Sequence, residues 1–246
     1  MLYGLGRSVD DYTTSFSRLV IMRKIKSITD RLLAGIALVT LSPIMLIAAI
    51  GVKISSKGPV FYRAKRMGIN QEPFTIYKFR TMRINADREG AITAVHDNRI
   101  FAWGEILRKT KIDELPQLIN ILQGTMSIVG PRPEDIDIVN KHYTEAEKRT
   151  LKVLPGLACP GSIFNYTHGD QYLIGNDTEA AYVNHFLHLK LALDIYYLDH
   201  WSLLYDIRII FRTIYTIIRS TISSKRMNFP IEYRKVFGEK EDEELH

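Results

Sequence analysis

Cysteine is scarce in this chain of 246 residues, since Cys159 is the single one. An internal disulfide is therefore excluded, and a structural zinc site, which draws on several cysteine or histidine ligands, is not expected. The histidines are scattered and form no recognisable ligand set. The sequence also lacks a Walker phosphate loop, a G-x-G-x-x-G fingerprint and a G-x-S-x-G elbow. These absences exclude the common nucleotide-loop and serine-hydrolase classes.

Negative charge is sparse outside the C-terminal end. The chain has 33 basic and 27 acidic residues, and five of the acids lie in Gly238–His246. Without that segment, 32 basic residues face 22 acidic ones, a formal charge of +10. A basic body favours a polyanionic partner: nucleic acid, anionic lipid or a phosphorylated small molecule. With 46% hydrophobic and 24% charged residues, the chain is otherwise typical of one globular domain.

A run of 21 uncharged residues, Leu32–Val52, dominates the hydropathy. As a straight helix at ~1.5 Å per residue it would reach roughly 30 Å, enough for a bilayer core. However, Ser42 and Pro43 lie at its centre, where proline removes a backbone hydrogen bond and kinks a helix. Basic residues also flank both ends, so the positive-inside rule gives no preferred orientation. A spanning helix and a re-entrant hairpin both stay open.

The segments around this run are less regular. Residues 1–17 have no clear period and no secretory-signal pattern, and we expect a loose leader there. Residues 56–83 combine β-rich stretches with glycine and proline, which predicts short strands and turns. The cations interleaved with them are compatible with a nucleic-acid face, a phosphate pocket beside a membrane, or a solvated surface. These cations are Arg63, Lys65, Arg66, Lys78, Arg80 and Arg83.

Two adjacent acids, Asp113 and Glu114, follow a cationic stretch and precede an apolar helical stripe. The pattern predicts Asp113 as the N-cap of that helix, with Pro116 in its first turn. The partial positive charge of a helix N-terminus favours an ionised carboxylate. Acids beside cations are typical of a site that holds Mg²⁺ and phosphate together. On spacing alone, however, a capped helix with ordinary surface lysines is favoured, because aspartate caps are common.

The remaining chain is predicted mainly from its periodicity. A polar helix is expected around residues 134–150 and loops over 153–180, which are rich in glycine, proline and asparagine. Residues 182–220 read as helical with a break near 199–202. In the last helix, three arginines share one face and aromatic and aliphatic residues fill the rest. Such a helix suits a membrane interface or a core-packed position with an exposed basic edge.

Several blocks of the sequence occur in the order and spacing of a known family. They are the Ser42-Pro43 pair in an apolar hairpin, GPVF at 58–61, YKFRTM at 77–82, LRK at 107–109, DELPQL at 113–118, Asn120 and SIVGPRP at 127–133. In these blocks the chain resembles the bacterial sugar transferase family, the monotopic polyprenyl-phosphate phosphoglycosyl transferases, over residues 25 to 220. With no further membrane helices before the run, it is similar to the minimal catalytic form.

The resemblance implies an activity and roles for named residues. Family members move a sugar 1-phosphate from a UDP-sugar to undecaprenyl phosphate and release UMP, which initiates polysaccharide, capsule, O-antigen or glycoprotein glycan assembly. Asp113 would be the nucleophile that becomes a covalent phosphosugar, and Glu114 would assist Mg²⁺ binding and proton handling. Both acids would hold the metal. Arg132 would bind phosphate near the lipid. The diphosphate would be held by Lys78, Arg80 and Arg108.

The same resemblance completes the predicted organisation. The Ser42-Pro43 break implies a re-entrant hairpin in the bacterial inner membrane, with the catalytic domain on the cytoplasmic face. We therefore predict a predominantly helical α+β fold with amphipathic interfacial helices and a small β element. The expected domains are a flexible leader (1–17), a membrane-inserting segment (18–55), a catalytic domain (56–225) and a tail with an acidic end (226–246). The expected partners are both substrates and membrane lipids, not nucleic acid.

The chain departs from the family pattern after Pro155-Gly156, where Ser162 stands near an expected glutamine. The region 157–177 therefore leaves the identity of the sugar open. A catalytically silent membrane scaffold of the same fold is the alternative function, although both acids that catalysis needs are present. Amphipathic surface helices are also compatible with a homodimer.

Overall fold

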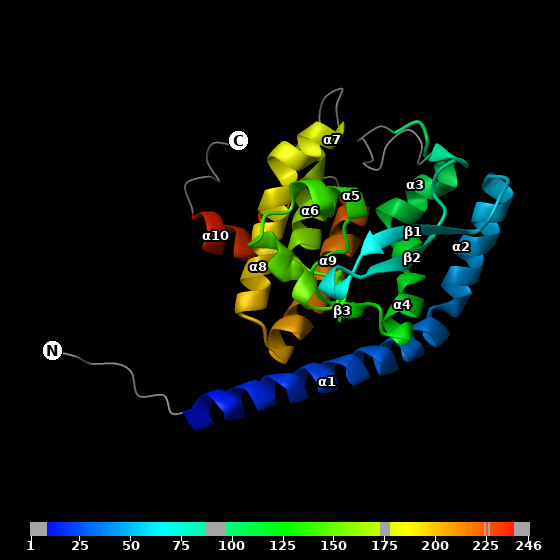
Figure 1. Ribbon diagram of the computed structural model, residues 1–246. Coiled ribbons are helices and arrows are strands. Elements are labelled where there is room, and N and C mark those ends of the chain that lie inside the picture. Colours follow the sequence, from blue (N-terminus) through cyan, green and yellow to red (C-terminus); the bar gives the residue numbers. More distant parts are fainter. Residues whose placement is uncertain (1–8, 87–96, 173–177, 224, 226, 239–246) are drawn as a thin grey trace.

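The computed structural model describes residues 9–86, 97–172, 178–223, 225 and 227–238, with side chains from residue 21 onward. The chain is mostly helical and contains two small sheets, which confirms the predicted α+β class (Figure 1). The α-helices are α1 (Val9–Thr40), α2 (Ser42–Ser55), α3 (Ala102–Lys109), α4 (Gln117–Gln123), α5 (Ile136–His142), α6 (Pro160–Tyr172), α7 (Thr178–Ala181), α8 (His188–Asp199), α9 (Leu203–Ile222) and α10 (Ile231–Phe237). Short 3₁₀-helices are η1 (Ile69–Gln71), η3 (Ile112–Glu114) and η4 (Glu147–Lys152), and η5 (Tyr182–Leu187) is a π-helix.

The sheets are small and lie on either side of the two acids in the sequence. Strands β1 (Phe61–Met67) and β2 (Pro73–Phe79) form an antiparallel hairpin, as the sequence predicts. Strands β3 (Ser127–Val129) and β4 (Gly156–Ala158) pair in parallel. The side chain of Asn120 on α4 joins α4 to the hairpin, because it donates to Thr75 O (2.7 Å) and accepts from Tyr77 N (3.1 Å).

The uncharged run forms two helices that meet at a sharp bend. Among the residues with described side chains, no single helix has the length and hydropathy of a membrane span, whereas Ile21–Thr40 and Ser42–Ser55 meet that criterion together, bent by 63°. Pro43 has no N–H to donate to Val39 O, and the Ser42 hydroxyl donates to that carbonyl instead, at 2.7 Å. The predicted break at Ser42 and Pro43 is therefore confirmed, with serine satisfying the carbonyl that proline leaves free.

One side of the bent pair covers the domain and the other side is exposed. In Figure 1, α1 runs along the bottom of the molecule and α2 turns up beside α3. Ala34 packs in a core cluster with α4, and Ala48 and Val52 pack against Phe79 and Leu107. The opposite faces expose large apolar side chains. Among them are Leu32, Ile36, Val39, Leu46, Ile47, Ile50 and Ile54. The buried face therefore fixes the pair to the domain, while the exposed face is left apolar.

Four segments differ from the sequence prediction. The polar helix expected around residues 134–150 is divided into α5 and η4. The first helix begins at Val9, so the expected loose leader is helical from there, and residues 1–8 lie outside the described residues. The stretch predicted as loops contains α6, because Phe164 on α6 is buried against α8 and α10. Within the expected tail, α10 buries Tyr233 in the same core cluster, so residues 231–237 belong to the packed domain. The helical break at 199–202 is confirmed.

The bend leads to a prediction about topology. Replacing Pro43 with alanine restores the N–H that Val39 O lacks, so we expect the two helices to straighten towards a single span. Cysteines introduced singly at Lys24 and Lys57, both exposed, report the two flanks. The native Cys159 is fully buried and does not interfere. In sealed vesicles, an impermeant maleimide should label both flanks from one side in the parent and from opposite sides in Pro43→Ala.

Ser42→Ala is the matched control, because it keeps the proline and should leave both flanks on one side. Labelling of both flanks from the same side in Pro43→Ala would show that the proline does not set the topology.

Candidate functional site

The two acids lie in a short 3₁₀ turn between two helices. After α3 ends, Lys111 adopts a left-handed conformation (φ 56°), and η3 then carries Asp113 and Glu114. The helix that follows starts at Gln117 with Pro116 as its N-cap residue. The predicted capping role of Asp113 is therefore wrong, because the left-handed Lys111 places both acids in a separate turn. A left-handed non-glycine residue costs free energy and is common beside functional sites.

Glu114 is held by three partners from different parts of the chain. Its Oε1 accepts from Lys78 Nζ on β2 at 2.9 Å. The Arg132 guanidinium lies against both carboxylate oxygens, with Nη1 3.1 Å from Oε2 and a close contact from Nη2 to Oε1. The Tyr166 hydroxyl on α6 donates to Oε2 at 3.3 Å. The bidentate arginine gives this arrangement both strength and a fixed orientation.

Asp113 is placed differently from its neighbour. Within the part of the chain that the structure describes, its carboxylate accepts no hydrogen bond, and it lines an open cleft of about 930 Å³. Lys78, Arg80 and Arg108 line the same cleft. Further cations from β1 and the following segment are Arg63, Lys65, Arg66, Arg83 and Arg99. The cleft therefore offers one unengaged carboxylate within a strongly cationic lining.

The two adjacent carboxyl groups have opposite pKa shifts. Burial alone would raise the pKa of Glu114, but the charges of Arg132 and Lys78 lower it well below its usual value. Burial, and then the Glu114 carboxylate, raise the pKa of Asp113 to about 6, despite the nearby cations. Both acids are thus predominantly ionised at neutral pH. The rise in the pKa of Asp113 is opposite to the lowering expected at a helix N-terminus, because burial and like-charge repulsion dominate.

The other predicted residues lie around this centre in different ways. Arg108 on α3 lines the cleft, and burial lowers its pKa although Asp113 opposes that shift. Arg80 also lines the cleft, but its guanidinium donates to Pro59 O (2.7 Å), Ser56 Oγ (2.7 Å), Ser56 O (2.8 Å) and Met82 O (3.3 Å). These contacts hold the connection from α2 to β1. They favour a positioning role for Arg80 over a direct hold on phosphate.

Two residues of the centre were not singled out as site residues from sequence. Tyr166 reaches Glu114 and Arg132 from α6, and Arg132 Nη1 donates to its hydroxyl at 3.2 Å. Lys111 places Nζ 4.0 Å from the centroid of the Tyr166 ring. Tyr166 lies in the stretch predicted as loops, so no periodic signal pointed to it. Ser162, at the departure from the family pattern, is fully buried beside Cys159 rather than at this centre.

The carboxylates suit Mg²⁺ unequally. Among the described residues there is no group of three or more histidine, cysteine, aspartate or glutamate side chains that could hold a metal ion. Mg²⁺ often takes only one or two carboxylates and completes its shell with water and substrate phosphate oxygens. Asp113 fits that role, since it lines the cleft and its carboxylate accepts no hydrogen bond from a described residue. The contacts of Glu114 with Lys78 and Arg132 make Glu114 the less suitable metal ligand.

Comparison with known proteins identifies the family. The family described as bacterial sugar transferase matches residues 21–220, and the chain belongs to this family. A UDP-glucose:undecaprenyl-phosphate glucose-1-phosphate transferase from Xanthomonas campestris pv. campestris is 38% identical, covering 76% of this chain and 37% of the relative. The exopolysaccharide production protein ExoY from Sinorhizobium fredii is 36% identical, covering 75% of this chain and 81% of the relative.

A third relative extends the range of sugars named. A UDP-N-acetylgalactosamine-undecaprenyl-phosphate N-acetylgalactosaminephosphotransferase from Aeromonas hydrophila is 37% identical, covering 79% of this chain and 44% of the relative. The chain thus spans less than half the length of the Xanthomonas and Aeromonas proteins.

The raised pKa of Asp113 predicts a stabilising substitution. Because the folded-state pKa lies above the ordinary 3.8, the ionised carboxylate destabilises the fold above pH 6. In magnesium-free buffer at pH 7.5, Asp113→Asn should therefore raise the free energy of unfolding by roughly 1–3 kcal/mol. As the pH falls from about 6 towards 3.8, wild-type Asp113 becomes protonated and the advantage should shrink. Thermal unfolding across this pH range measures both effects.

Glu114→Gln should have the opposite effect, because it leaves the Arg132 guanidinium without its carboxylate partner. We expect a loss of roughly 3 kcal/mol or more, as for other buried pairs that lose one partner. Equal destabilisation by both substitutions would contradict the division between a free and a paired acid.

Proposed function

We propose that this chain transfers a sugar 1-phosphate from a UDP-sugar to undecaprenyl phosphate, releases UMP, and so initiates assembly of a membrane-linked glycan. Family membership and the names of the relatives support the reaction class. The observation that carries the proposal is the unengaged Asp113 carboxylate in the cationic cleft, beside a Glu114 that is fully engaged. This pairing separates a nucleophile from a group that orients its surroundings.

The proposed reaction has two displacements at one phosphorus atom. First, an Asp113 carboxylate oxygen forms a bond to the β-phosphorus of the UDP-sugar, while the bond from that phosphorus to the bridging oxygen breaks and UMP leaves. Second, a phosphate oxygen of undecaprenyl phosphate forms a bond to the same phosphorus, and the aspartyl bond breaks. The products are UMP and a polyprenyl diphosphate sugar, and the Asp113 carboxylate is restored. Splitting the reaction lets one anion leave before the next arrives.

The cations of the site act on the charge of these substrates. Lys78 and Arg108 line the cleft beside Asp113, where they offset the repulsion between the carboxylate and the diphosphate. Arg132 lies behind the acid pair and fixes Glu114, so its position sets the geometry of the centre. We include Mg²⁺ in the proposal, held by Asp113 together with substrate phosphate oxygens. When bound, the metal neutralises developing charge on the phosphoryl group.

The lipid substrate agrees with the bent N-terminal helices. A pair bent by 63° with an apolar exposed face suits insertion into one leaflet of a bilayer, with both basic flanks on the same side. We propose that this side is the cytoplasmic face of the bacterial inner membrane, where a water-soluble UDP-sugar would reach the cleft. The bent pair of α1 and α2 then holds the cleft at the depth of the phosphate group of undecaprenyl phosphate.

The first test is UMP release by the purified full chain in lipid nanodiscs, with undecaprenyl phosphate, Mg²⁺ and a panel of UDP-sugars. We expect release that depends on the lipid and on a particular donor. Asp113→Asn should lower turnover by at least about 10⁴-fold, because it removes the nucleophile with little change in volume. Asp137→Asn, an exposed change of the same type, is the control.

Mass spectrometry of the wild-type chain, given donor without lipid, should find a sugar phosphate on Asp113. A folded wild-type chain that neither releases UMP nor forms the adduct with any donor would favour the scaffold alternative. Substantial turnover by Asp113→Asn would overturn the nucleophile assignment.

Removing divalent cations should stop the reaction without disturbing membrane insertion or folding. With EDTA, we expect UMP release to stop while nanodisc insertion and thermal unfolding stay close to those of the untreated chain, since no described group of carboxylates forms a structural metal site. Restoring Mg²⁺ should restore release. Full activity in EDTA would exclude the metal from the proposed reaction.

A further inference from the structure

Backbone hydrogen bonds hold the turn that carries Arg132 on both sides of this residue. Gly130 N donates to Ala158 O at 3.0 Å, and Gly156 N donates to Pro131 O at 2.8 Å. The backbones of Gly130 and Gly156 lie so close together that a Cβ atom on Gly156 would be 2.1 Å from Gly130 N. Proline on both sides of Arg132 further limits its backbone conformations. Beyond Arg132 the turn leaves strand β4. Met67 N at the end of β1 donates to Glu134 O at 2.9 Å, and buried side chains add to this attachment.

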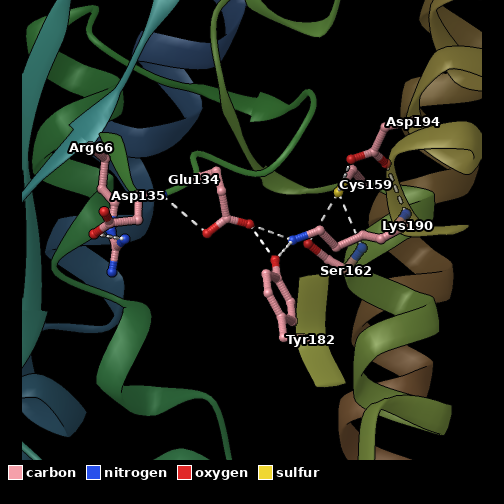
Figure 2. Close-up of polar contacts among 9 residues, drawn as sticks. Arg66, Glu134, Asp135, Cys159, Ser162, Tyr182, Lys190 and Asp194 are labelled. Atoms are coloured by element: carbon pink, nitrogen blue, oxygen red, sulfur yellow. Dashed lines mark hydrogen bonds and ion pairs between the residues drawn. The ribbon is translucent and has the colours of Figure 1, made fainter. Parts of the chain in front are cut away.

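The side chain of Glu134, the next residue but one, binds two residues outside the turn (Figure 2). Lys190 Nζ on α8 lies 2.7 Å from Glu134 Oε2, and the Tyr182 hydroxyl donates to the same oxygen. Glu134, Lys190 and Tyr182 are 9%, 4% and 6% exposed. Burial would raise the pKa of Glu134, but the Lys190 charge and the bonds from both partners lower it to about 2.

A carboxylate on α8, that of Asp194, also contacts the turn, one helical turn after Lys190. Asp194 Oδ1 accepts from Gly161 N at the start of α6, at 2.8 Å, and the backbone N–H of Arg132 interacts with the same carboxylate. Lys190 and Asp194 are four residues apart and therefore share a face of α8. Figure 2 shows both side chains approaching the space between the turn and α6. One face of α8 thus contacts the turn at Arg132 and at Glu134.

We infer that Glu134, Lys190 and Asp194 are positioning residues of the catalytic centre, which hold the 130–135 turn so that Arg132 reaches Glu114. This inference rests on the proposed function only for its kinetic consequence. None of the three is described in contact with Glu114, so each acts through Arg132. A shift of about 1 Å in a group that orients reacting atoms can reduce a rate by about 100-fold.

Stability alone is a poor explanation of this cluster. Burying an ion pair costs desolvation free energy, and well-packed apolar residues often replace such pairs without loss of stability. What apolar residues cannot supply is direction, because the Glu134 contacts fix one orientation of the turn. Tyr182, one of those contacts, is also the first residue of η5, a π-helix of the kind often found at functional sites.

The chain contains a matched control for this cluster. Glu232 on α10 is 0% exposed and likewise binds one cation and one tyrosine. It accepts from Arg212 at 2.5 and 2.8 Å and from Tyr205 at 2.6 Å. Glu134→Gln and Glu232→Gln therefore remove the same chemistry from two places. A structural role predicts similar effects of both substitutions, whereas a positioning role predicts a kinetic effect of the first alone.

The experiment compares kcat/KM for UMP release by the full chain in nanodiscs, at equal folded fraction. Glu134→Gln should lower kcat/KM by about 10- to 100-fold, the usual range for a residue that orients a catalytic group, while Glu232→Gln leaves it unchanged. In an Arg132→Lys background, Glu134→Gln should have less than about a twofold further effect, because both changes act through one side chain. Equal losses from Glu134→Gln and Glu232→Gln, or additive losses with Arg132→Lys, would overturn the inference.

Hydrogen exchange gives a readout that needs no activity. In Glu134→Gln, the amides of Gly130, Arg132, Glu134 and Asp135 should exchange at least about tenfold faster, and in Glu232→Gln they should not. Unchanged protection in Glu134→Gln would overturn the inference even if wild-type turnover is high. Faster exchange in a chain that is inactive with every donor would instead reject the proposed function and leave the attachment of the turn supported. If Glu134→Gln does not fold, Tyr182→Phe and Tyr205→Phe provide the same comparison.

Discussion

The contact between Glu114 and Arg132 is the interaction on which the site depends. Glu114 lies in η3, Arg132 in the turn after β3, Lys78 on β2 and Tyr166 on α6, and all of them meet at one carboxylate. Four segments distant in sequence are thus joined around a single buried anion. Because so many donors converge on Glu114, its charge is compensated. The neighbouring Asp113 carboxylate, in contrast, accepts no hydrogen bond from a described residue.

This unequal distribution of hydrogen bonds and cations gives the two adjacent acids different pKa values. Burial opposes both charges, but the nearest cations are directed at Glu114, which lowers its pKa, whereas the pKa of Asp113 rises to about 6. A carboxylate that is ionised at neutral pH yet poorly stabilised is more basic than an ordinary aspartate, and basicity favours attack on phosphorus. Asp113 therefore lowers the stability of the fold and supplies a basic carboxylate at the cleft, as the proposed nucleophile requires.

Much of this arrangement could be predicted from sequence, and the failures have physical causes. The bend between α1 and α2 follows from the conformational effect of proline. The β1–β2 pair follows from β-propensity, and the break before α9 follows from the helical periodicity. The capping role of Asp113 failed because a lysine took the left-handed conformation. Helix α6 was missed because its glycine and polar content suggested loops, whereas burial of Phe164 against α8 and α10 overrides weak propensity. Tyr166 was missed with it.

A further polar network joins helix α1 to the turn that carries Arg132, and so links the proposed membrane-inserting segment to the proposed catalytic centre. Lys26 on α1 pairs with Asp206 on α9 at 2.8 Å, and Asp30 accepts from Ser127 Oγ at 2.5 Å. Ser127 begins β3, and β3 leads directly into the turn of Arg132. Since Asp30 and Asp206 are both buried, a displacement of α1 would leave charged groups unpaired. The position of α1 and the position of Arg132 are therefore coupled, as the proposed reaction between a soluble donor and a membrane-bound phosphate requires.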